Sequence, residues 1–141
     1  MTEALTDRPM VLVVDDEPLV ADTLAMILTR AGYHAVRAYD AQSALEIASV
    51  QSPDLLISDV AMPVMNGVEL AISMMSMAPD CKVVLFSGHA RSVDLMRAYD
   101  AGYEFPLMAK PMHPSEMLGQ VAKSLRSCAG GGRLRVVVGK G

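Results

Sequence analysis

Five short apolar segments alternate with five segments of helical pattern along these 141 residues. The apolar segments are predicted strands at residues 10–14, 34–38, 55–58, 82–86 and 105–109. The predicted helices follow them at about residues 18–31, 41–50, 68–77, 92–101 and 114–127. Apolar strands without polar alternation indicate a sheet that is buried on both faces. Regular strand–helix alternation with short loops favours a parallel sheet with right-handed crossovers. The pattern therefore predicts one α/β domain, three-layered and doubly wound.

Turn and capping residues support this division of the chain. Asp40 is a predicted N-cap for the second helix, and Gly32 and Gly102 are predicted helix ends. Pro114 fits the first turn of the last helix. We expect an N-terminal tail at residues 1–8, the domain at 9–127, and a glycine-rich basic tail at 128–141.

Charge and composition narrow the classes of partner. Residues 1–127 contain all 16 acidic residues and nine of the 12 basic ones, a net charge of −7, whereas residues 128–141 carry +3. An acidic body disfavours direct DNA binding. No apolar run is long enough to cross a membrane, and residues 1–9 lack a signal-peptide core, so we expect a cytoplasmic protein without a membrane partner. Cys81 and Cys128 are expected to be reduced thiols.

Charged and hydroxyl side chains stand where predicted strands end. Asp15 and Asp16 follow the first strand, Asp59 the third, Ser87 the fourth and Lys110 the fifth. In an open parallel sheet, ligand sites gather at the carboxyl ends of the strands. Three acids with one lysine indicate a site that handles a divalent cation and an anionic group together.

Each of these residues also has an ordinary structural explanation. Asp15 and Asp16 fit a solvated turn before a helix, Asp59 a loop aspartate before Met62-Pro63, Lys110 a surface lysine, and Ser87 a loop hydroxyl. A solvated turn is an adequate explanation for Asp15 and Asp16 alone. It is a weak explanation once Asp59 and Lys110 are counted together with them.

Five motifs carry a resemblance to a known family. They are Val13-Val14-Asp15-Asp16-Glu17-Pro18, Leu55-Leu56-Ile57-Ser58-Asp59-Val60-Ala61-Met62-Pro63, Asn66-Gly67, Phe86-Ser87-Gly88 and Ala109-Lys110-Pro111. In this order and spacing, they resemble the receiver domain of two-component response regulators, the CheY-like superfamily, over residues 9–127. The resemblance implies a flavodoxin-like (βα)5 fold with a five-stranded parallel sheet in strand order 2-1-3-4-5.

The resemblance also implies a reaction. Asp59 would accept a phosphoryl group from a histidine kinase or phosphotransfer protein, with Mg²⁺ required. Asp16 and Asp59 would bind the metal directly, Asp15 would act through a water, and the backbone carbonyl of Ala61 would complete the protein ligands. Lys110 would contact a phosphoryl oxygen.

The switch that the resemblance implies is incomplete. Ser87 would hydrogen-bond the phosphoryl group, but Leu107 stands where the family usually has an aromatic ring on the fifth strand. A leucine has no large ring with a polar tip to move between buried and exposed positions. Ala61 and His89 occupy positions that tune phosphoryl loss to water, although His89 fits a solvent-facing loop equally well.

Output is expected through protein contact, because no DNA-binding helices follow residue 127. The predicted helix at 92–101, strand at 105–109 and helix at 114–127 form the usual output face, a candidate for homodimerisation or for an unidentified protein target. Its apolar members are Leu95, Met96, Tyr99, Leu107 and Met112. The tail at 128–141 is either a solvated end or an extra strand on a sheet edge.

Two other functions stay open. A receiver-like scaffold that is never phosphorylated would explain Leu107, although the intact acids and Lys110 argue against it. A haloacid dehalogenase-like phosphohydrolase also forms an aspartyl phosphate, but it needs a second aspartate two residues after the first-strand nucleophile, where this chain has Glu17. We therefore expect a signalling protein rather than an enzyme.

Overall fold

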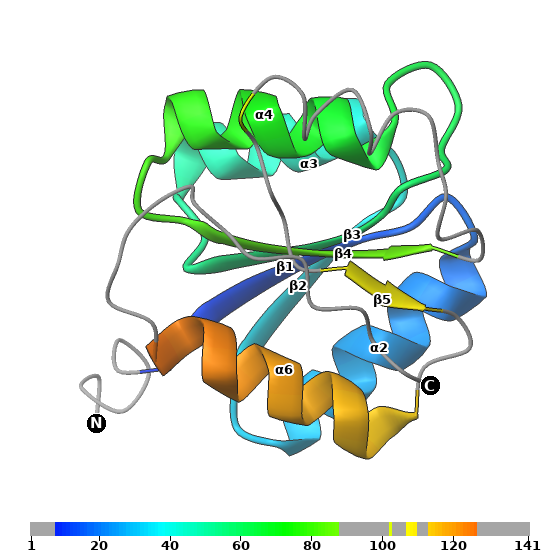
Figure 1. The fold of residues 1–141 in the computed structure, drawn as a ribbon, viewed down its shortest axis with the longest axis vertical. Coiled ribbons are helices and arrows are strands. Elements are labelled where there is room, and N and C mark those ends of the chain that lie inside the picture. Colours follow the sequence, from blue (N-terminus) through cyan, green and yellow to red (C-terminus); the bar gives the residue numbers. More distant parts are fainter. Residues whose placement is uncertain (1–7, 88–101, 103–106, 110–112, 127–141) are drawn as a thin grey trace.

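A parallel five-stranded sheet between two layers of helices forms the fold (Figure 1). The computed structural model describes residues 8–87, 102, 107–109 and 113–126. The strands are β1 (Met10–Val14), β2 (His34–Ala38), β3 (Leu55–Asp59), β4 (Lys82–Ser87) and β5 (Leu107–Ala109). Their order is β2-β1-β3-β4-β5, and every pair is parallel. The predicted fold class and strand order are confirmed.

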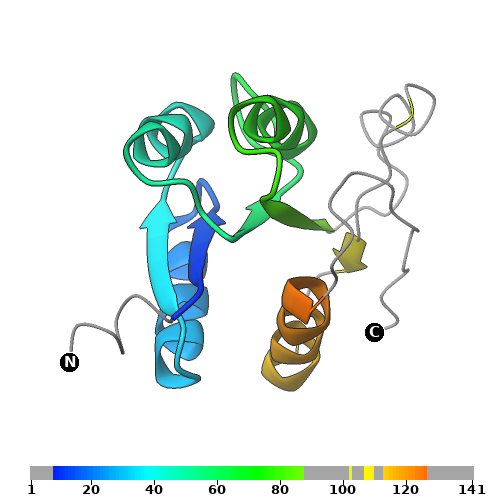
Figure 2. The same cartoon turned by 90° about the vertical axis from the view of Figure 1, so that its left-hand side faces the viewer.

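Four helices lie in the described part of the chain. They are α2 (Pro18–Arg30), α3 (Ala41–Val50), α4 (Gly67–Met77) and α6 (Pro114–Arg126). The helix predicted at 92–101 lies outside the described residues. Helices α3 and α4 cover one face of the sheet, and α2 and α6 cover the other (Figure 2).

Two apolar clusters explain why the central strands lack polar alternation. Alternate β1 residues face opposite sides: Leu12 and Val14 pack toward α3 and α4, whereas Val11 and Val13 pack toward α2 and α6. All five residues of β1 are buried, and so are all five of β3. A strand buried on both faces needs apolar side chains at nearly every position.

Capping residues set where helices begin. The Asp40 carboxylate accepts from the Ser43 backbone N–H at 2.7 Å, which confirms the predicted N-cap of α3. Helix α4 starts with a reciprocal capping box between Asn66 and Glu69, with hydrogen bonds of 2.9 and 3.0 Å. The N-cap of α3 and the capping box of α4 satisfy backbone donors that a helix N-terminus otherwise leaves without partners.

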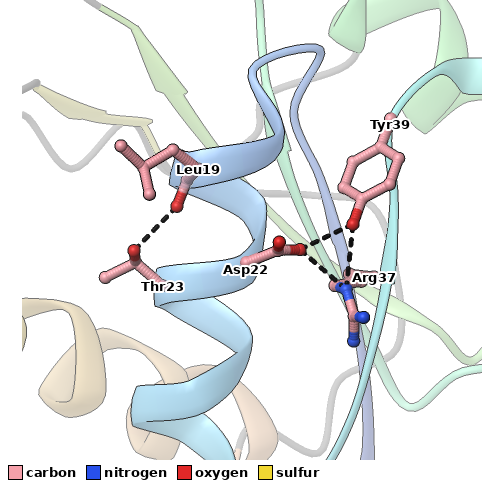
Figure 3. Close-up of polar contacts among 5 residues, drawn as sticks. All are labelled: Leu19, Asp22, Thr23, Arg37 and Tyr39. Atoms are coloured by element: carbon pink, nitrogen blue, oxygen red, sulfur yellow. Dashed lines mark hydrogen bonds and ion pairs between the residues drawn. The ribbon is translucent and has the colours of Figure 1, made fainter.

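A polar network ties the edge strand β2 to helix α2 (Figure 3). The Arg37 guanidinium lies 2.7 Å from the Asp22 carboxylate and donates to the Tyr39 hydroxyl at 3.0 Å. The Tyr39 hydroxyl in turn donates to Asp22 at 2.7 Å. The side chains of Arg37 and Asp22 are about half exposed, so solvent screening limits their contribution to stability.

None of the helices described here is both long enough and apolar enough to cross a membrane. Cys81 is a free, buried thiol, and burial raises its pKa to about 12.

Candidate functional site

Three carboxylates meet at the carboxyl edge of the sheet. Oxygens of Asp15, Asp16 and Asp59 all lie within 4.8 Å of one another. Asp15 is fully buried and Asp59 is 5% exposed, whereas Asp16 is open to solvent. The three predicted acidic residues are therefore brought together, although Asp15 and Asp16 are more than 40 positions from Asp59 in the chain.

Strand pairing produces this convergence. Val14, the last residue of β1, is in register with Ser58, the residue before Asp59 on β3. Parallel neighbours in register end at the same level, so the residues that follow them meet. The Asp15 backbone N–H donates to the Ala38 carbonyl of β2 at 3.2 Å, which holds the turn against the sheet.

Backbone N–H groups orient two of the carboxylates. The Glu17 N–H donates to Asp15 Oδ1 at 2.9 Å, immediately before helix α2 begins at Pro18. The Ala61 N–H donates to Asp59 Oδ1 at 3.3 Å. These bonds are local, so the direction of each carboxylate depends on the backbone within two residues of it.

The donor set suits a hard divalent cation. Mg²⁺ prefers oxygen ligands, usually one or two carboxylates together with waters and phosphate oxygens. Two carboxylates at this separation repel by on the order of 1–4 kcal/mol, depending on the local dielectric, and a bound cation would reverse that interaction. Two of the three acids are buried, and buried charges need a partner. The arrangement is therefore better explained by a cation site than by a solvated acidic turn.

The loop at residues 60–66 joins β3 to α4 beside these acids. Ala61 is exposed and lies two residues after Asp59, and its backbone N–H contacts the Asp59 carboxylate. Val64 has a positive φ of 67° and is fully exposed. A β-branched residue in the left-handed region is strained, because its Cβ crowds the backbone.

Ser87 and Leu107 lie on β4 and β5, the two strands that follow β3 in the sheet. Ser87 ends β4 and is buried, and the adjacent Phe86 pairs with Asp59. Leu107 begins β5 opposite Leu85 and is 9% exposed, within the apolar cluster on the α3–α4 side. At the position where the family usually has an aromatic ring, this chain therefore has a packed aliphatic side chain.

Six of the predicted residues belong to segments other than those that the structure describes. Lys110, His89 and the output-face residues Leu95, Met96, Tyr99 and Met112 lie outside the described residues. The position of Lys110 and His89 at the acidic site and the apolar output face both stay predictions.

Two residues beside Asp59 were not singled out by their chemistry in the sequence. The Ser58 hydroxyl is fully buried and donates to the Asp59 carbonyl at 2.9 Å. Gly67 lies against that same carbonyl: a Cβ added to it would sit 2.1 Å from the oxygen. In the sequence, both residues stand only within motifs that carry the family resemblance, and a serine inside an apolar strand is the one available sign of Ser58's role.

The fold agrees with the comparisons to known proteins. A profile of the "Response regulator receiver domain" family matches residues 11–122. The chain is 30% identical over 115 residues to the "Response regulator receiver protein CpdR" of Brucella abortus, a match that covers 82% of this chain and 95% of that protein. It is 32% identical over 117 residues to the "Chemotaxis protein CheY" of Thermotoga maritima, covering 80% of this chain and 97% of that protein.

A solved structure gives the same result. The CheY-like receiver domain protein from Methanospirillum hungatei JF-1 superposes with a TM-score of 0.78 at 25% identity, covering 85% of this chain and 95% of that one. Several other relatives are described as transcriptional regulatory proteins, and the chain spans about half of their length. This chain belongs to the response regulator receiver domain family of two-component signalling proteins.

Proposed function

We propose that this chain is a phosphoacceptor receiver that signals by protein contact in the cytoplasm. A histidine kinase or phosphotransfer protein would donate a phosphoryl group to Asp59, and the changed surface would regulate a protein target or a homodimer, without direct DNA or membrane contact. The observation that carries the proposal is the meeting of Asp15, Asp16 and Asp59 within 4.8 Å at the carboxyl edge of the sheet.

Asp59 is the proposed nucleophile because carboxylates form acyl phosphates readily when correctly placed. Its carboxylate oxygen forms a bond to phosphorus, and the bond between phosphorus and the donor's imidazole nitrogen breaks, leaving aspartyl phosphate and free histidine. The Ala61 N–H, 3.3 Å from Asp59 Oδ1, orients the carboxylate for this attack.

The remaining site residues have proposed binding roles. Asp16, Asp59 and the Ala61 carbonyl would hold Mg²⁺, with Asp15 acting through a water. When bound, Mg²⁺ would neutralise the charge of the carboxylates and phosphoryl oxygens. Lys110 would pair with a phosphoryl oxygen, and the Ser87 hydroxyl would donate to another. His89 and Ala61 would tune access of water to the phosphoryl group.

Leu107 bears on how the signal leaves the site. A buried leucine in the core cluster supports a readout that does not use ring rotation. We propose that Ser87 and the residues that follow it transmit phosphorylation to the predicted output face at residues 92–101, 105–109 and 114–127. The receiver unit proposed for this role is residues 9–127, between tails at 1–8 and 128–141.

Intact-mass measurement after incubation with acetyl phosphate and Mg²⁺ tests the proposal. We expect one added phosphoryl group in the wild type, and none in Asp59→Asn or without metal. A folded wild type that binds Mg²⁺ but gains no phosphoryl group would refute the proposal and favour a receiver-like scaffold. Turnover of small phosphate esters would favour a phosphohydrolase.

A further inference from the structure

Ser58 is a polar side chain at a position where the fold calls for an apolar one. It lies on β3 between Val14 of β1 and Leu85 of β4, and all three residues are fully buried. A hydroxyl at such a position is unfavourable unless it is hydrogen-bonded. Its Oγ donates to the main-chain carbonyl of Asp59 at 2.9 Å.

The same carbonyl is confined from a second direction. Gly67, the first residue of α4, lies so close that a Cβ there would be 2.1 Å from the Asp59 oxygen and 3.0 Å from Ser58 Oγ. Only a residue without a side chain fits against this carbonyl.

The next peptide is held as well. The Gly67 N–H donates to the Val60 carbonyl at 2.9 Å, and the Val60 N–H donates to the Phe86 carbonyl of β4 at 3.0 Å. Strand β4, helix α4 and the Ser58 hydroxyl thus hold the main chain of residues 59 and 60 from different sides. Because the Ala61 N–H bonds Asp59 Oδ1, rotation of these peptides would turn the carboxylate.

We propose that Ser58 is a positioning residue for Asp59. With Gly67, it fixes the main chain so that the Asp59 carboxylate faces Asp15 and Asp16. This role rests on the proposed function, because the direction of the Asp59 carboxylate matters most if Asp59 shares a bound cation with Asp15 and Asp16. If Ser58 served packing alone, replacing it would leave the affinity for the cation unchanged.

The test compares two variants that each shorten a fully buried side chain. Ser58→Ala removes the hydroxyl. Val11→Ala, on β1 and on the opposite face of the sheet, opens space in the core away from the site. Mg²⁺ affinity is measured by NMR titration of backbone amides, together with hydrogen exchange of the Gly67 N–H and thermal unfolding. Phosphorylation by acetyl phosphate is followed in parallel.

We expect Ser58→Ala to weaken Mg²⁺ binding about tenfold, as loss of a group that orients a metal ligand commonly does. It should also speed exchange of the Gly67 amide and slow phosphorylation. Val11→Ala should unfold at a lower temperature and keep the wild-type Mg²⁺ affinity. Gly67→Ala displaces the same carbonyl from the other side and should weaken Mg²⁺ binding at least as much.

Wild-type Mg²⁺ affinity in Ser58→Ala would overturn the proposal, and so would an equal loss of affinity in Val11→Ala. A wild type that binds Mg²⁺ but accepts no phosphoryl group would refute the proposed function. The Mg²⁺ comparison would still decide the role of Ser58.

Discussion

Replacing Gly67 by alanine should destabilise this protein, although alanine is the better helix former. The added Cβ would lie 2.1 Å from the Asp59 carbonyl oxygen and 2.9 Å from its carbon, whereas ordinary contact begins at 3.4 Å. The clashing atoms belong to the backbone of a buried strand, so no side-chain rotation relieves the overlap. Either β3 or the start of α4 must shift by about 1 Å.

The size of the effect follows from two opposed terms. Overpacking a close-packed site costs about 1–3 kcal/mol. Exchanging glycine for alanine inside a helix gains about 1 kcal/mol at most, and less in the first turn. We therefore expect Gly67→Ala to lower the free energy of unfolding by about 1–2 kcal/mol.

Gly119→Ala is the matched control. Gly119 is exposed within α6, and an added Cβ would meet no atom within 4 Å. This variant should gain up to about 1 kcal/mol from helix propensity alone. Urea unfolding followed by far-ultraviolet circular dichroism measures both. If Gly67→Ala were as stable as the wild type while Gly119→Ala showed its gain, the close contact with Asp59 would be refuted.

Three further predictions test other parts of the structure. Asp40→Ala should lower the free energy of unfolding by about 1 kcal/mol at pH 7. Because hydrogen bonds from Ser43 lower the pKa of Asp40 in the folded protein, this stability difference between wild type and variant should shrink as the pH falls through that pKa. Urea unfolding at several pH values measures it, and a difference that stays constant with pH would contradict the prediction. Cys81, with its pKa raised to about 12 by burial, should resist iodoacetamide at pH 8 in the native protein and react in denaturant, as peptide mass mapping would show; rapid native labelling would argue against the burial. Val64→Asn should raise stability by roughly 1 kcal/mol, because asparagine tolerates a positive φ and no burial is lost; an unchanged unfolding midpoint would mean that Val64 is unstrained.

Local features of the sequence were sufficient for the layers and for the elements that the structure describes, whereas the strand order was implied by the family resemblance. Apolar strands without alternation, the Asp40 cap and the regular strand–helix order depend on short-range chemistry, and they predicted the layers and the elements within a few residues. Strand β3 extends one residue further than expected, to Asp59, and α4 begins one residue earlier, at Gly67. Both differences arise at the acidic site, where β3 pairs with β4 as far as Phe86 and the Asn66 cap starts the helix.

The sequence by itself also determined which residues were candidates for the site, since the motifs that carry Asp15, Asp16 and Asp59 can be read without coordinates. Only the tertiary structure decided that their oxygens lie within 4.8 Å and that two of the acids are buried. It alone revealed the contact of Gly67 with the Asp59 carbonyl and the strained φ of Val64. The reason is physical: periodicity and capping depend on neighbours along the chain, whereas the distance between strand ends and the fit of a glycine against a carbonyl exist only after the sheet has paired and the loop has closed.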